Sequence, residues 1–219
     1  MSFGKSEPLS VIARNLADLQ RRLDAVRDPD RKQHLFDTLP AELQGRMEAL
    51  WAQLYSDRGR KNVPVSGGRW AGEAGNSLWI PDDGVVPPDK GYSNMHHKTW
   101  KQIKAENGIK GITFDDGRAD FKPVSKYTLS FDWDQAFGRD GVRYILDSGD
   151  RQFLHEAAFS MLARKLGVPV DRVKEIKESR NLVWHEEPDC CTLRLVLREV
   201  HDNIRHFGGI AMLAVVCAG

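Results

Sequence analysis

The stretch from residue 182 to residue 209, LVWHEEPDCCTLRLVLREVHDNIRHFGG, contains three of the seven histidines of the chain. One apolar run ends at His185, a turn with a proline follows, and a second apolar run covers residues 190–197. The remaining segment carries His201 and His206 and ends at a double glycine, which is typical of a helix stop. We therefore expect two strands and then a helix, with histidines at the end of the first strand and on the helix.

The overall composition is that of an ordinary globular protein. With 219 residues, 41% of them hydrophobic and 29% charged, the chain is long enough for one or two domains with a real core. The net charge of +1 does not indicate a nucleic-acid binder, so such a function must rest on local basic patches. No apolar run approaches the length of a membrane-spanning segment, and the first residues lack the apolar core of a secretory signal.

The cysteines argue against a disulfide framework. There are three, of which Cys190 and Cys191 are adjacent, and no CxxC pair is present. Neighbouring residues on a strand point to opposite faces, so these two are expected to pack and not to form a bridge. This pattern indicates synthesis in a reducing cytoplasm.

The chain divides into a helical part and a mixed part. Leucine, isoleucine and valine recur at steps of three and four residues over 9–26, and a second apolar stripe follows Pro40. We predict a helical hairpin over residues 1–57, which would serve as a packing module or dimer seam, or as an adaptor to a delivery protein. A polar, basic joint over 58–65 is the predicted linker, and residues 66–219 form the second domain.

The second domain is predicted to mix helices with short strands. Residues 66–92 are rich in Gly, Pro and Asp and are expected to form an ordered loop. Asp116-Gly117 is a strong signal for a hairpin turn, and alternating residues over 127–133 indicate a strand that begins at Tyr127. Helices are expected over 100–106, 150–166 and 170–179, and the second of these should end at Gly167. In the N-terminal part, the first helix of the chain should end near Asp28-Pro29-Asp30. The fold class is therefore α+β.

The three clustered histidines have the chemistry that phosphodiester hydrolysis needs. Imidazole titrates near neutral pH, and neutral imidazole also binds zinc and transition metals. We assign His185 as the general base and His201 and His206 as metal ligands. Five positions on a continuous helix rotate the second side chain by about 140° past the first, so the helix should end near His206. Alternatively, one of the pair binds the metal and Asp189 or Glu186 completes the site.

Other polar side chains are weaker candidates. Lysines and one arginine interleave with aromatic residues over 98–127, and Lys122 is the predicted phosphate contact among them. Acidic residues in the same segment make a mixed solvated surface an equal alternative. Arg180 and Arg205 are predicted to steady the substrate backbone. His96 and His97 form a pair in a polar stretch, either as surface residues or as a substrate contact.

Three ordered blocks of sequence carry a resemblance to a known family. They lie within residues 66–81, 111–125 and 184–209, and the first contains Gly-Glu-Ala-Gly-Asn-Ser from residue 72 to residue 77. Over residues 66–210 the chain resembles the nuclease toxin domains of the HNH/endonuclease VII superfamily, in the subfamilies marked by a Trp-His-His triplet. The resemblance implies a ββα-metal catalytic unit over residues 182–209.

The resemblance also implies an activity and partners. It implies an antibacterial toxin that hydrolyses DNA with one divalent metal ion, Mg, Zn, Mn or Ni. Such a toxin is made in the bacterial cytoplasm beside a cognate immunity protein and is delivered into the cytoplasm of a target cell. By position, His185 matches the base, His201 and His206 match the metal-site histidines, and Glu73 and Asn76 match a catalytic loop that orders the site.

The sequence departs from the family pattern at two positions. Glu186 stands where the triplet usually has a histidine, which bears on metal preference, and Ala74 stands where an arginine is common. Two alternatives stay open. The same site would serve an RNase, because the motif does not read the sugar. The second alternative is a non-enzymatic binding module in which the histidines hold a structural metal.

Overall fold

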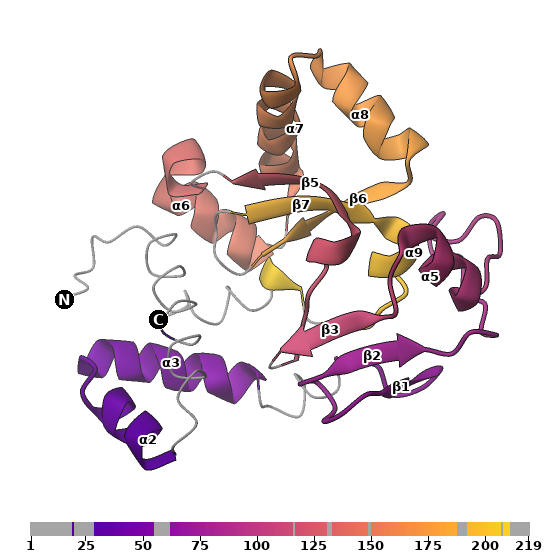
Figure 1. Ribbon diagram of the computed structural model, residues 1–219. Helices are drawn as coiled ribbons and strands as arrows, with labels where there is room; N and C mark the ends of the chain where they lie inside the picture. The colour runs from indigo at the N-terminus through magenta and orange to yellow at the C-terminus, as the bar shows by residue number, and fades with distance from the viewer. Residues whose placement is uncertain are drawn as a thin grey trace.

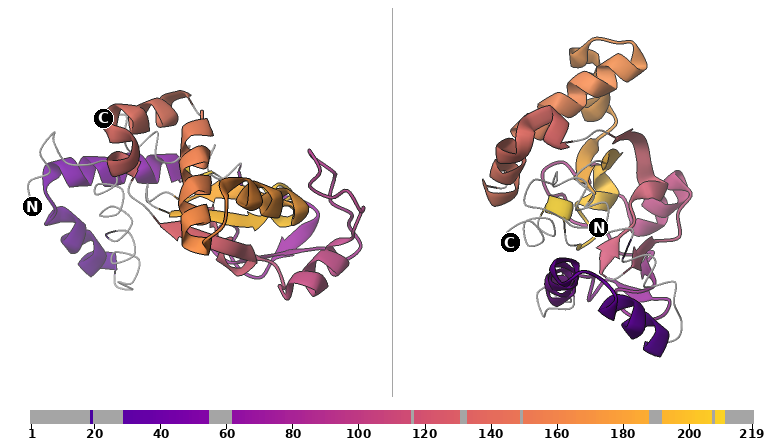
Figure 2. Two further views of the ribbon diagram at one scale, coloured as in Figure 1. Left: turned by 90° about the horizontal axis from the view of Figure 1, so that it is seen from above. Right: turned by 90° about the vertical axis from the view of Figure 1, so that its left-hand side faces the viewer.

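The computed structural model describes residues 19, 29–54, 62–115, 117–130, 133–148, 150–187, 192–206 and 208–210. Within these residues the molecule is a mixture of helices and two small antiparallel sheets, in agreement with the predicted α+β class. Figure 1 shows α7 and α8 over the three-stranded sheet, with α2 and α3 at the far side of the molecule. The right-hand view in Figure 2 shows the same separation of these helix pairs.

The N-terminal part begins differently from the prediction. Most of the predicted helix over 9–26 lies outside the described residues. Helix α2 (Pro29–Asp37) begins at the proline where a stop was predicted, because proline suits the first turn of a helix as well as its end. Helix α3 (Ala41–Leu54) follows Pro40 as predicted, and Leu43 and Met47 of its stripe are buried. Residues 55–61 are not described, so the division into a hairpin, a linker over 58–65 and a second domain stays a prediction.

The four-stranded sheet has the order β1-β2-β3-β4. Its first two strands, β1 (Gly68–Trp70) and β2 (Leu78–Pro81), form within the segment that was predicted to be a loop. Trp79 of β2 is buried, and its ring lies 5.2 Å from that of Trp70, so the tryptophans stabilise the pairing. Strands β3 (Ile112–Asp115) and β4 (Arg118–Ala119) form the predicted hairpin, with Gly117 at a φ of 74°.

The three-stranded sheet has the order β5-β7-β6 and contains the first part of the histidine-rich stretch. A 3₁₀ turn, η1 (Lys122–Val124), leads into β5 (Ser125–Ser130), which pairs with β7 (Thr192–Leu197). Strand β7 also pairs antiparallel with β6 (Leu182–Glu186). The strand predicted to continue to Trp133 ends at Ser130. Trp133 instead begins α6 (Trp133–Ser148), which sequence reasoning did not predict and which is interrupted by non-helical backbone at Gly138.

The helices around the two sheets follow the sequence closely. Helix α5 (Trp100–Asn107) starts at a capping box on Thr99 and ends at Gly108 in the left-handed conformation. Helix α7 (Gln152–Leu166) ends at Gly167 in the same way, and α8 (Val170–Ser179) follows it. Leu154, Ala158 and Leu162 form the buried face of α7, whereas 59% of the surface of Phe153 is exposed.

Candidate metal centre

His185 is placed by the alternation of side chains along β6. Its neighbours Trp184 and Glu186 contact α7: the Trp184 ring lies 5.6 Å from Phe159, and Glu186 is 2.8 Å from His155. His185 lies between them on the strand and therefore points to the opposite face of the sheet. There it contacts Phe121, with the ring centroids 4.9 Å apart.

The segment after β7 is a short helix followed by a turn, which corrects the predicted helix through His206. Helix α9 (Arg198–His201) ends at His201. The turn after it is closed by hydrogen bonds from the amides of Asn203 and Ile204 to the carbonyl of Val200, and Ile204 is buried. The chain therefore reverses before His206. This removes the rotation of about 140° that a continuous helix would place between the two histidines.

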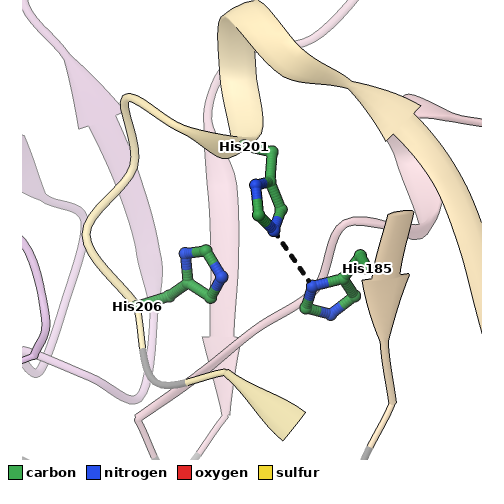
Figure 3. Close-up of side chains that lie close together, drawn as sticks. All are labelled: His185, His201 and His206. Carbon is green, nitrogen blue, oxygen red and sulfur yellow. Dashed lines mark hydrogen bonds between the residues drawn. The ribbon is translucent and has the colours of Figure 1, made fainter. Parts of the chain in front are cut away.

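The three histidines converge on one point. One ligand nitrogen from each of His185, His201 and His206 lies within 4.8 Å of the others. Figure 3 shows the rings facing one another, with Nδ1 of His185 3.3 Å from Nε2 of His201. This is the one group of three or more metal-binding side chains among the residues that the structure describes.

Phe121 forms an apolar wall against all three imidazoles. Its ring centroid lies 4.9 Å from those of His185 and His201 and 4.8 Å from that of His206, and its side chain is fully buried. An aromatic ring in this position limits the rotation of the imidazoles and keeps water from one side of the cluster. Phe121 thus joins the β4–η1 connection to the histidine cluster.

The second nitrogen of two of the imidazoles is held by an oxygen acceptor. Nδ1 of His201 lies 2.8 Å from Oδ1 of Asp202, and Nδ1 of His206 lies 2.8 Å from the carbonyl oxygen of Ile204. Each Nδ1–H can therefore donate outward, which leaves Nε2 unprotonated and facing the cluster. Acceptors in this position orient metal-binding histidines and raise their basicity as ligands.

Burial keeps two of the imidazoles neutral. Burial, and then the nearby His201 and His206, lowers the pKa of His185 to about 2. Burial, and then His201, lowers the pKa of His206 to about 4, although the Ile204 carbonyl opposes that shift. A protonated ring in this cluster would be desolvated beside two other imidazoles. At neutral pH both side chains are therefore neutral and have a lone pair available for a metal.

Glu186, one of the two other predicted ligands, is not in this cluster. Glu186 is 4% exposed, and Oε1 of its side chain lies 2.8 Å from His155 and 3.8 Å from Arg151, on the α7 face of the sheet. The structure therefore turns Glu186 away from the face on which the histidines meet. Asp189 lies outside the described residues.

The remaining predicted residues lie on the surface. Nδ2 of Asn76 is 3.5 Å from Oε2 of Glu73 in the exposed loop between β1 and β2, so these two residues contact each other. Arg180, Arg205 and Lys122 are exposed. None of these five side chains belongs to the group of converging ligand atoms in the described part of the chain.

Sequence reasoning missed the two residues that support the histidines. Asp202 follows His201 directly, and a carboxylate adjacent to a candidate ligand was an available signal. Phe121 gave no comparable signal, because it lies far from the histidines in the sequence and only the fold brings it to them.

Three converging imidazoles, two of them with the outer nitrogen held by an oxygen acceptor, define a candidate transition-metal centre. The comparisons with known proteins agree with a nuclease. Residues 113–208 match the family model described as the DNase/tRNase domain of colicin-like bacteriocin. The matched region contains all three histidines and Phe121 and begins after the loop of Glu73 and Asn76. The match supports a nuclease toxin domain in this part of the chain.

No curated protein and no solved structure matches the chain. None of the helices in the described residues has the length and apolar character needed to cross a membrane.

Proposed function

We propose that this chain is a metal-dependent endonuclease toxin that hydrolyses DNA, with a ββα-metal catalytic unit formed by β6, β7 and α9. The observation that carries the proposal is the convergence of His185, His201 and His206 within the region that matches a nuclease toxin family. The order strand, strand, helix agrees with such a unit, and the histidines lie at the end of β6, on α9 and just after it.

The three side chains fit a transition metal ion. All three donors are imidazole nitrogens, which suit zinc, nickel and related ions, whereas magnesium prefers oxygen ligands. The outer hydrogen bonds to Asp202 and Ile204 fix the ligand nitrogens of two of the rings. We therefore favour zinc or nickel over magnesium. With three protein ligands, further coordination positions would be open to substrate and water.

The geometry favours His185 as the third ligand over the predicted role as general base. A general base works best when its pKa lies near the operating pH, and burial lowers the pKa of His185 to about 2. A neutral buried imidazole facing two others is instead suited to binding a metal. When bound, an ion of this kind supplies charge stabilisation at the phosphate and lowers the pKa of water.

The partners follow from the same proposal. The matched family description names both DNase and tRNase, so DNA is our proposed substrate and RNA is the second candidate. A toxin of this class requires a cognate immunity protein in the producing cell, and we propose one for this chain together with delivery into a target cell. The N-terminal helices are the proposed contact for a delivery protein or a second copy.

Cutting of plasmid DNA tests the proposal. The chelator-treated protein is incubated with supercoiled plasmid, and in parallel with total RNA, in the presence of Zn²⁺, Ni²⁺, Mn²⁺ or Mg²⁺. We expect nicking of DNA that depends on added metal and is abolished in the variants His185→Ala, His201→Ala and His206→Ala. His34→Ala, an exposed histidine on α2, is the matched control and should cut normally.

Metal affinity of His185→Ala separates its two roles. If His185 is a ligand, this variant loses metal binding and cutting together. If it is a base alone, the variant binds metal normally and does not cut. A protein that binds metal, cuts neither nucleic acid and unfolds with chelator would instead be a binding module with a structural metal.

A further inference from the structure

A small cleft lies between the loop over residues 87–98 and the corner where α8 meets β6. Its volume is about 210 Å³, less than that of a typical drug-sized pocket and suited to one planar ring. Met95 and His96 line it from the loop, and Arg180 and Asn181 line it from the corner. We call it the corner cleft.

The corner cleft lies beside the helix that carries His201. Lys98 at the end of the loop is 2.9 Å from Glu199 of α9, which also accepts a hydrogen bond from Asn107 at the end of α5. Asn203, in the turn between His201 and His206, donates to Ser93 of the loop. Figure 1 shows α5 and α9 side by side at this end of the molecule. Helix α9 and the turn after it therefore connect the loop that lines the corner cleft to the segment that carries the histidine cluster.

Unfavourable backbone conformations gather around the corner cleft. Tyr92, His97 and Asn181 have φ values of 69°, 49° and 49°, and they are the non-glycine residues with positive φ in the described part of the chain. Asn181 also donates from Nδ2 to the carbonyl of Tyr92 at 2.9 Å, which ties the corner to the loop. Asparagine commonly adopts a positive φ just after a helix, as Asn181 does after α8, so the strained positions are Tyr92 and His97 of the loop. Strained backbone of this kind is concentrated at binding sites.

Asn94 makes the loop rigid. Its side chain is buried, and Nδ2 donates to the carbonyls of Pro87 and Lys98 at 2.8 and 3.0 Å. Its Oδ1 accepts from the amide of Lys98 at 2.9 Å. Met95 and His96 are therefore exposed on a fixed loop, a preformed surface that loses little conformational entropy on binding.

The charged groups that line the corner cleft leave the guanidinium of Arg180 available to a ligand. The carboxylate of Glu199 is paired with Lys98, and that of Glu178 is paired with Lys177. Arg180 has a long contact of 3.4 Å to the hydroxyl of Tyr127, and no carboxylate among the described residues pairs with it. Its guanidinium is a planar donor that can stack on a base or bind a phosphate.

We propose that the corner cleft binds an unstacked nucleobase of the substrate strand between the imidazole of His96 and the guanidinium of Arg180. Unpaired bases stack on histidine rings and on arginine planes in nucleic-acid-binding proteins. The inference rests on the proposed nuclease function. It adds that the nuclease prefers DNA whose bases are locally unstacked.

Binding without cutting tests this proposal. Fluorescence anisotropy of a labelled single-stranded DNA and of the matching duplex is measured with the full chain in excess EDTA. We expect tighter binding of the single strand, and a loss of about five- to fifty-fold for His96→Ala combined with Arg180→Ala. His96→Phe keeps a stacking ring and should bind within about twofold of the unmodified chain.

Two exposed residues away from the cleft supply the controls. His34→Ala on α2 and Arg172→Ala on α8 remove the same side-chain types and should leave the anisotropy curves unchanged. Single-strand binding by the double variant that equals that of the unmodified chain would overturn the proposal and would favour a protein partner for this surface. Equal losses in His96→Phe and His96→Ala would also overturn it, because stacking would not be the cause.

The nuclease proposal and the cleft proposal fail in different ways. If the unmodified chain cuts plasmid with metal but the cleft variants bind DNA normally, the cleft inference alone is wrong. If the unmodified chain neither binds nor cuts nucleic acid, the proposed function is wrong and the cleft inference falls with it.

Discussion

Single oxygen acceptors set the ligand atoms of the candidate metal centre. Asp202 and the carbonyl of Ile204 each hold an Nδ1 atom, of His201 and His206 respectively, at 2.8 Å. Because neutral imidazole has one N–H, these contacts favour the tautomer whose Nε2 lone pair faces the cluster. The Asp202 carboxylate has the additional effect of stabilising positive charge on the imidazole–metal unit.

Asp202→Asn should therefore weaken metal binding without removing a ligand. The asparagine can still accept a hydrogen bond but has no charge, so we expect metal affinity to fall by about ten- to a hundred-fold. Competition with a fluorescent zinc chelator measures this affinity. Asp140→Asn, at an exposed position on α6, is the control. Unchanged affinity in Asp202→Asn would mean that the carboxylate does not support His201.

Glu186→Gln should lower stability and leave metal binding intact. The Glu186 carboxylate is buried against His155 and Arg151 of the α7 side, so the variant loses a charge-assisted hydrogen bond worth about 1 kcal/mol or more. Urea unfolding measures this change, and zinc affinity should stay within about twofold of the unmodified protein. A large loss of zinc affinity would restore Glu186 as a ligand and contradict the arrangement seen here.

At the scale of secondary-structure elements, the end of β6 packs closely against the segment after His206. A Cβ built on Gly209 would overlap the carbonyl oxygen of Glu186, so glycine is required for the close approach of these two backbones. Gly208 has no such neighbour. The contact at Gly209 fixes the chain three residues after His206 against the strand that carries His185.

Gly209→Ala should displace His206 and weaken the metal centre. The added methyl group must push the segment away from β6, so we expect a loss of roughly 2–3 kcal/mol in stability and a measurable fall in zinc affinity. Thermal unfolding with and without zinc measures both effects. Gly208→Ala is the matched control and should change either quantity little. Equal behaviour of the two variants would show that the close approach at Gly209 does not position His206.

Local patterns in the sequence predicted several elements well. Apolar periodicity and glycine stops located α7 and α8, and Asp116-Gly117 located the β3–β4 hairpin. The histidine stretch gave β6 and β7 because its two apolar runs are separated by a proline turn. The patterns failed where a tertiary contact decided the outcome, as in the reversal of the chain at Ile204, which is buried in the core.

The same limit applies to the candidate site. His201 and His206 were identified as a pair because they are near in sequence, but their meeting with Phe121 depends on the fold. Glu186 was assigned to the site because it follows His185. Its actual partner, His155, lies on another helix, and the alternation of side chains on β6 directs the two neighbours to opposite faces.

At the scale of the whole molecule, the candidate centre joins the two sheets. His185 comes from the three-stranded sheet, and Phe121 follows β4 of the four-stranded sheet. A metal held by the three histidines would therefore fix the rings against which Phe121 packs. Any protonation of these buried imidazoles would act against the whole folded state.

Stability of the metal-free protein should fall as the pH is lowered from 7 to 5. In the unfolded chain, histidines take up protons near pH 6.5, whereas His206 and His185 in the folded chain do so at about 4 and about 2. The unfolded state thus binds more protons in this window, and the free energy of unfolding falls by about 2 kcal/mol for each such histidine. Urea unfolding at both pH values measures the loss. It should be smaller in His206→Asn, and an identical pH dependence in that variant would contradict the assigned pKa.

Calorimetric titration of zinc into the chelator-treated protein at neutral pH is the most direct measurement of the three-histidine centre. We predict binding of one ion per chain, accompanied by restored cutting of plasmid DNA in the same sample, and loss of both in His201→Ala. Zinc binding and cutting that persist in His201→Ala, or cutting that needs no metal, would contradict the proposed centre.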